Sequence, residues 1–172
     1  MKRTITVLVN NKSGVLNRMT GLFARRQYNI DSITVGVTEN PTISRMTFVV
    51  FVDSMENVEQ MIKQLHKQVD VLKIKDITDE AIVERELALV RVGATPQQRG
   101  EIASLAETFR AQAVDIGKES MTLQITGNNE KIEAFIELVK PYGIQELART
   151  GVTAVNRSSK ASTDTSRLTL IN

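Results

Sequence analysis

A short polar segment at residues 10–16, Asn-Asn-Lys-Ser-Gly-Val-Leu, carries groups suited to holding a free amino acid. It separates an alternating apolar stretch from an amphipathic one, so it should join a strand to the start of a helix. A helix start presents unpaired backbone N–H groups and the positive end of the helix dipole, which attract a carboxylate. Gly14 permits close approach to the backbone, and the Asn11 amide can accept from an ammonium. These groups could therefore bind both charged ends of an α-amino acid.

A second candidate half-site follows at residues 28–33, Tyr-Asn-Ile-Asp-Ser-Ile, where the predicted helix ends and the next strand begins. Asn29 offers another amide, and Ile30 offers an apolar contact for an aliphatic ligand side chain. Glycine and asparagine at such junctions are also common turn residues, so the residues alone leave a purely structural role open.

Composition excludes several other kinds of chemistry. The 172 residues include no cysteine and a single histidine, His66, which rules out thiolate catalysis, Cys-ligated metals and most histidine-based acid–base schemes within one chain. Carboxylates such as Glu84, Glu86, Glu101 and Glu107 are interspersed with basic residues and are expected on solvated faces. No phosphate-binding glycine motif is present. We therefore expect a protein that is not an enzyme on its own, with no catalytic residues, metal site or cofactor.

Nucleic acid and membrane partners are not expected either. The net charge is +2 and aromatic residues make up 4% of the chain, which gives no concentrated basic patch and few stacking side chains. Residues 45–51 superficially match an RNA-recognition pattern, but Phe48 and Phe51 would lie on opposite faces of a strand. No apolar run reaches the roughly 20 residues that span a bilayer, and the N-terminus lacks a signal-peptide pattern. We expect a cytoplasmic protein.

The elements that must position these residues occur twice along the chain. In the first half, hydrophobic periodicity predicts strands at 4–9, 33–37, 46–52 and 71–77 and helices at 14–26 and 55–69. In the second half it predicts strands at 87–92, 114–117, 122–126 and 144–149 and helices at 96–109 and 132–139. Each half has the order βαββαβ, so the predicted fold class is α+β, with two tandem ferredoxin-like domains.

These elements predict a first domain at 1–78, a linker at 79–85, a second domain at 86–155 and a polar, mobile tail at 156–172. In the second domain, Leu123 and Ile125 lie on one face of a strand and polar residues lie on the other, so one face of the sheet can remain exposed to solvent. In the first domain both faces of the third strand are apolar, with Val49 and Phe51 opposite Phe48. Helices cover only one face, so we expect another copy or another protein on the second.

Several separated segments, read together in register, resemble one known family. They are residues 14–18, 21–23, 28–35, 44–47, 63–67, 83–87 and 148–151. Over roughly residues 1–155 the chain resembles the acetolactate synthase (acetohydroxyacid synthase) small regulatory subunits. The resemblance implies that the first domain is an ACT domain, that two copies form a homodimer, and that valine or a related branched-chain amino acid binds between them. The matching effector-binding positions are Asn11, Ser13, Gly14, Val15, Leu16, Asn29 and Ile30.

The same resemblance implies a role in branched-chain amino-acid biosynthesis. Small subunits of this kind activate a catalytic large subunit, which uses thiamine diphosphate, Mg²⁺ and FAD to make acetolactate from pyruvate, and they confer feedback inhibition on it. One departure is Gln27, where family members often have glycine after the first helix, so the turn before Asn29 could differ in shape. The alternative is an ACT-domain amino-acid sensor that regulates a different enzyme or a transcription factor, although no helix-turn-helix pattern is visible.

Overall fold

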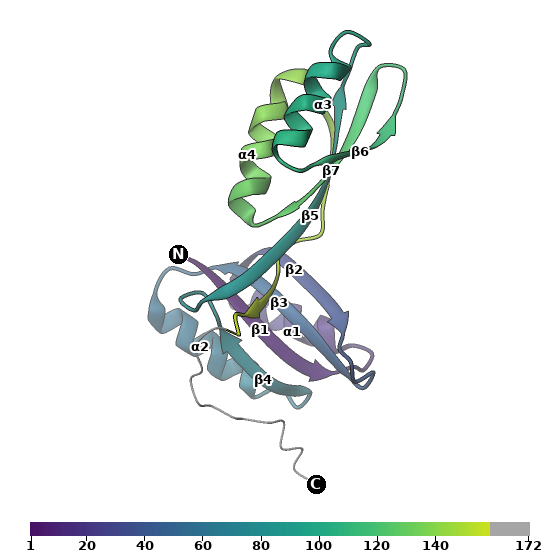
Figure 1. Cartoon of the computed structure of the whole chain (residues 1–172). Helices are drawn as coiled ribbons and strands as arrows, with labels where there is room; N and C mark the ends of the chain where they lie inside the picture. Colours follow the sequence, from purple (N-terminus) through teal and green to yellow (C-terminus); the bar gives the residue numbers. More distant parts are fainter. Residues whose placement is uncertain (159–172) are drawn as a thin grey trace.

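The chain forms two lobes of similar plan, each an antiparallel sheet with two helices on one face (Figure 1). The computed structural model describes residues 1–158. The first lobe contains β1 (Lys2–Asn10), α1 (Val15–Arg25), β2 (Asn29–Val37), β3 (Ile43–Phe51), α2 (Met55–His66) and β4 (Val71–Asp76). The second contains β5 (Ile82–Gly93), α3 (Arg99–Thr108), β6 (Gln112–Ile116), β7 (Ser120–Gly127), α4 (Asn129–Val139), a 3-10 turn (Lys140–Tyr142) and β8 (Ile144–Arg149), and β9 (Thr153–Asn156) follows. The predicted α+β class and repeated βαββαβ order are confirmed.

The first sheet has the strand order β2-β3-β1-β4, which leaves β2 and β4 at its edges. Alternation places Ile5, Val7 and Val9 of β1 against the helices, where they are fully buried. Phe23 of α1 packs on Phe48 of β3 with ring centroids 4.8 Å apart, which fixes the helix over the centre of the sheet. The core of this lobe therefore holds both ends of α1, and with them the two candidate half-sites, in fixed positions.

The second sheet has the order β6-β7-β5-β8. Leu123 and Ile125 of β7 are buried under α3 and α4, as their alternation predicts. Phe109 and Phe135 close this core with centroids 5.5 Å apart. No helix within residues 1–158 is both long and apolar enough to cross a membrane.

The predicted linker at 79–85 is wrong in its second half, because β5 begins at Ile82 and runs without interruption into the second lobe. Its first four residues, 82–85, pair with β9. Figure 1 shows this two-stranded ribbon lying across the first sheet while the rest of β5 crosses to the second lobe. Glu84 and Arg85 are the charged residues that made this strand look like a linker in the sequence.

The second apolar face of the first sheet is covered by the chain itself, which corrects the expectation that it needs a partner. Val49 is 1% exposed and packs with Ile77, Val152 and Ala154 in a small separate core. Phe51, at the end of β3, remains half exposed. The hydrophobic driving force for association through this face is therefore largely satisfied within one chain.

The predicted tail also begins too early. Asn156 ends β9, and the backbone N–H of Arg157 donates to the Ala81 carbonyl over 2.8 Å. The remainder of the predicted tail, 159–172, lies outside the described residues.

Candidate functional site

The first half-site lies at the end of β1, where the chain turns into α1. The backbone N–H of Asn11 donates to the Thr42 carbonyl over 2.7 Å, which ties the turn to the β2–β3 connection. The Asn11 side-chain Nδ2 donates to the Pro41 carbonyl over 2.9 Å. This bond uses the donor side of the amide, so Oδ1 is the atom left to accept from a ligand ammonium.

Gly14 is the N-cap of α1 and has a φ of +81°, a conformation that only glycine adopts without strain. No side chain caps this helix start, and the Val15 N–H donates to the Lys12 carbonyl over 3.4 Å. The N–H groups of Leu16 and Asn17 are then the ones that a ligand or water could reach. A Cβ added at Gly14 would lie 3.2 Å from Nη1 of Arg18. The space over Gly14 is therefore narrow and bordered by a guanidinium.

A charged cluster flanks this helix start and was not predicted from the sequence. Nη2 of Arg18 donates to Oδ2 of Asp70 over 2.5 Å, and Nζ of Lys12 lies 3.9 Å from Oδ1 of the same carboxylate. The Arg18 hydrogen bond holds the pKa of Asp70 below its usual value. Asp70 and Arg18 are 52 positions apart, so no local pattern could have joined them.

The remaining predicted residues of this half-site differ in accessibility. Val15 is 3% exposed and belongs to the core, so only its backbone can face a ligand. Leu16, in the first turn of α1, is 43% exposed. Ser13 is also exposed. The Leu16 side chain therefore offers an accessible apolar surface beside the start of α1.

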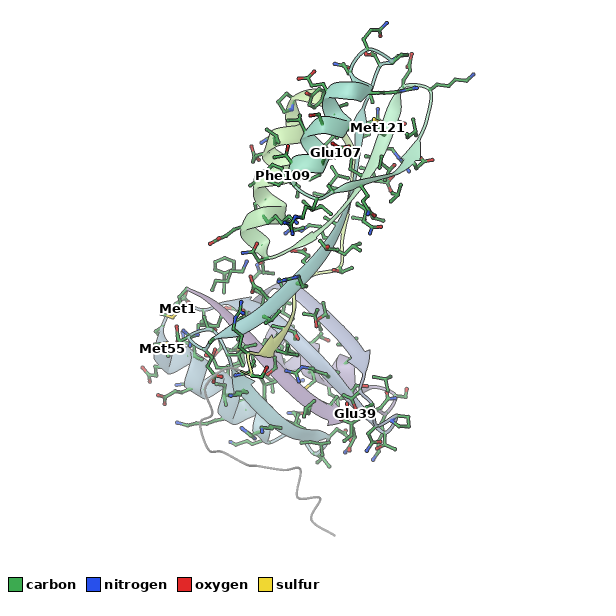
Figure 2. The ribbon with its side chains drawn as sticks, viewed as in Figure 1. Met1, Glu39, Met55, Glu107, Phe109 and Met121 are labelled. Carbon is green, nitrogen blue, oxygen red and sulfur yellow. The ribbon has the colours of Figure 1, made fainter. Side chains whose placement is uncertain are left out.

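The second half-site is at the opposite end of the same sheet. Asn29 pairs with Phe51 in the β2–β3 ladder, and Phe51 pairs with Lys2, whereas Asn10 pairs with Ile43 at the other end. Figure 2 labels Met1 and Glu39, which mark these two ends. A strand of this length separates them by about 27 Å at 3.4 Å per residue. One chain therefore does not bring Asn11 and Gly14 together with Asn29 and Ile30.

Two clefts lie beside the second half-site. Asn29 borders a polar cleft of about 450 Å³ that is also lined by Arg26, Gln27, Asn57 and Gln60. Gln27 has a φ of +58°, so it adopts the left-handed turn for which glycine is usual. The chain therefore keeps a left-handed turn before Asn29, although it has glutamine instead of glycine at position 27.

Ile30 borders a second cleft, of about 520 Å³, between the two lobes. Glu86 on its wall was expected to be solvated, but its side chain is only 3% exposed. It accepts two hydrogen bonds from Arg149, Nε to Oε1 over 2.7 Å and Nη2 to Oε2 over 2.9 Å. The Glu86 bonds, followed by that to Glu133, raise the pKa of the guanidinium above its ordinary value. Within residues 1–158, no three carboxylates or histidines are placed to hold a metal ion.

The whole described chain is similar to known proteins of one kind. A family model described as "AHAS small subunit-like ACT domain" matches residues 5–73, and one described as "Small subunit of acetolactate synthase" matches residues 85–158. The acetolactate synthase small subunit of Bacillus subtilis (strain 168) is 58% identical over 160 residues, 93% of each chain. The probable acetolactate synthase small subunit of Archaeoglobus fulgidus is 53% identical over 160 residues, 93% of this chain and 99% of that protein.

A solved structure agrees with these matches. The acetolactate synthase small subunit from Thermotoga maritima superimposes with a TM-score of 0.82 at 41% identity, covering 91% of this chain and 98% of that one. The two lobes therefore correspond to the two matched regions, and the first is an ACT domain. The chain belongs to the acetolactate synthase small-subunit family.

Proposed function

We propose that this chain is a non-catalytic regulatory subunit that activates the catalytic subunit of acetolactate synthase and reduces that activation when a branched-chain amino acid binds. The thiamine diphosphate, Mg²⁺ and FAD chemistry that converts pyruvate to acetolactate then belongs to the catalytic subunit. The effector, valine or a close relative, binds between the ACT domains of two copies. The observation that carries this proposal is the position of the two half-sites at opposite ends of a sheet with a free edge.

A two-fold axis beside β2 would assemble one complete site from two chains. β2 is an edge strand, and two copies of it can pair antiparallel. Antiparallel pairing brings the Asn29 end of one copy beside the Val37 end of the other, and that end carries Asn11 and Gly14. Because β3 lies between β1 and β2, three strand spacings of about 4.8 Å would separate the half-sites of the two copies. Pairing would therefore reduce their separation from about 27 Å to about 14 Å, a gap that side chains and a bound amino acid can span. Each dimer then has two equivalent sites.

Side chains along the same edge support this pairing. Val35 of β2 is 47% exposed and Val37 is 59% exposed. Val35 pairs with the buried Met46, which places it on the helix side of the sheet, where α1 of a second copy would lie. An exposed apolar strip on a free strand edge favours association. With Leu16 nearby, it would give the effector an aliphatic environment.

The first test is isothermal titration of the protein with valine, leucine and isoleucine. We expect the wild-type chain to bind at least one of them. Gly14→Asp should abolish binding, because the new carboxylate fills the space over the helix start and repels the ligand carboxylate. Gly143→Asp is the matched control, since Gly143 has a φ of +85° and open space around it. Normal binding by Gly14→Asp, or none by wild type, would reject the proposal.

Mixed dimers test whether each site needs two chains. Asn29→His alone should weaken binding, as should Gly14→Asp alone. In a mixed dimer of the two variants, one site carries both substitutions and the other carries neither, so one intact site returns. If both half-sites of one chain instead bound the same ligand molecule, every site in the mixed dimer would carry one substitution, and mixing would not restore binding. Recovery measured by titration after subunit exchange distinguishes the two arrangements.

A further inference from the structure

The segment that links the end of β8 to β9 binds both lobes, and we name residues 149–152 the interdomain strap. Its first half is anchored in the second lobe. Arg149 bonds to the buried Glu86, and its Nη1 donates to Oε1 of Glu133 on α4 over 2.6 Å. The backbone N–H of Thr150 donates to the Leu87 carbonyl over 3.0 Å, and Thr150 Oγ1 accepts from the Leu87 N–H over 3.0 Å.

The second half of the strap is anchored on β2 of the ACT domain. Oγ1 of Thr34 donates to the Val152 carbonyl over 2.9 Å, and the Val152 N–H donates to Oγ of Ser32 over 3.4 Å. Gly151 has a φ of +81°, and a Cβ there would lie 3.0 Å from Cβ of Ser32. A glycine is therefore needed both for the turn and for the close contact with β2.

These contacts lie next to the proposed effector site. Asn29 and Ile30 open β2, and Ser32 is two residues beyond Ile30. The β2–β3 register shifts between Ile30 and Ser32, which marks a bulge, and bulges re-aim the strand that follows them. A ligand that contacts Asn29 would therefore act on the same short piece of strand that holds the strap.

The open space between the lobes allows a change in their relative orientation. On the ACT side, Lys2 and Asp31 form an ion pair of 3.0 Å that borders the cleft, and Glu133 and Arg149 face them from the second lobe. These two charged walls are not bonded to each other in residues 1–158. Interlobe interfaces of this polar kind commonly permit rotation.

We propose that the interdomain strap transmits the effector state of the ACT dimer to the second lobe, whose orientation is the regulatory output. This inference rests on the proposed function and assigns a role to the second lobe. Effector binding at the β2 edge favours one conformation of Ser32 and Thr34, and the strap transmits this conformational change to Arg149 and α4. Binding energy is thus converted into a shift between two lobe orientations, as any coupling between distant sites requires.

The test removes the two hydroxyl contacts without touching the effector residues. In Ser32→Ala/Thr34→Val, we expect effector affinity by titration to stay within about twofold and activation of the catalytic subunit to persist. Inhibition at saturating effector should fall at least about fivefold, the lower end of common coupling strengths. Thr153→Val is the control, since Thr153 is exposed on the adjacent strand, and it should be inhibited like wild type. Unchanged inhibition in the double variant would overturn the proposal.

A distance measurement tests the movement itself. The sequence has no cysteine, so Glu39→Cys/Lys118→Cys places spin labels only at the two chosen positions, one in each lobe. The labelled protein is diluted with excess unlabelled protein before the measurement. In the otherwise wild-type chain, the distribution of distances between the two labels should change when effector is added. In the Ser32→Ala/Thr34→Val chain it should not change. If wild type binds effector without a distance change, the strap proposal is wrong while the effector site stands. If wild type binds no branched-chain amino acid, the proposed function itself fails.

Discussion

Gln27 and Arg110 each adopt a left-handed backbone, with φ of +58° and +53°, directly after a helix. The Tyr28 N–H bonds to the Phe23 carbonyl and the Ala111 N–H to the Ala106 carbonyl, which defines a Schellman motif at both helix ends. This conformation costs a residue with a Cβ about 1–2 kcal/mol, and the greater unfolded-state freedom of glycine offsets about 0.5–1.

Glycine at these two positions should therefore stabilise the protein. We expect Gln27→Gly and Arg110→Gly each to raise the free energy of unfolding by about 0.5–1 kcal/mol in urea denaturation. Arg26→Gly is the contrasting variant, because Arg26 has a φ of −99° and should lose about 0.5–1 kcal/mol. Equal effects at positions 26 and 27 would contradict the assignment of strain.

Asp70 gives the helix-start cluster a defined pH dependence. Arg18 lowers the pKa of the Asp70 carboxyl in the folded protein below its usual value of 3.8. The folded state then binds fewer protons than the unfolded state, so this stabilisation is present above about pH 4 and disappears as pH falls through the folded pKa. Asp70→Asn should be less stable than wild type at neutral pH, and the difference should shrink in acid and in high salt. Urea unfolding from pH 7 to pH 2 checks this.

The sequence predicted the local position of some candidate site residues and could not predict the long-range contacts of others. Asn11 and Gly14 lie between a strand and a helix, as predicted, because an alternating apolar stretch precedes them and an amphipathic stretch follows them. Asp70 and Glu86 were not, since their partners Arg18 and Arg149 are 52 and 63 positions away. Long-range ion pairs depend on how elements pack, and no local periodicity records that packing.

At the scale of elements, the free edge of β2 leads to a test of self-association. Val35→Lys places a charge on the exposed helix side of this edge, where a second ACT domain would pack. We expect it to shift the protein from dimer to monomer in sedimentation velocity, because burying an unpaired ammonium is costly. Val69→Lys is a matched control, since Val69 is 95% exposed in the turn after α2. If the Val35→Lys variant is still a dimer, β2 does not form the dimer interface.

Strand and helix patterns were predictable where one face alone is apolar. β1 and β7 alternate cleanly, and their buried residues agree with the prediction. The first residues of β5 and all of β9 were missed for a common reason. Glu84 and Arg85 interrupt the alternation, and β9 has only four residues, so neither segment has a periodic signal of its own. Each becomes a strand because the other pairs with it over the first sheet.

At the scale of the whole molecule, that ribbon makes the two lobes one structural unit. β5 supplies a strand to the second sheet and, with β9, covers the face of the first. Arg45 of β3 adds a bond from Nη2 to the Ala154 carbonyl over 3.3 Å. Elements shared between two cores couple their unfolding, so we expect a single cooperative thermal transition for the wild-type chain.

A charge placed under the ribbon should separate the two lobes energetically. Val152 is 5% exposed between the ribbon and Val49, so Val152→Asp buries a carboxylate without a partner at a cost of at least about 2 kcal/mol. The ACT domain should then melt first, giving two calorimetric transitions, while the second lobe keeps its own core of α3, α4 and sheet. Val155→Asp makes the same substitution nearby at a half-exposed valine and should leave one transition near the wild-type temperature. If both variants melt alike, the packing of Val152 against Val49 does not couple the unfolding of the two lobes.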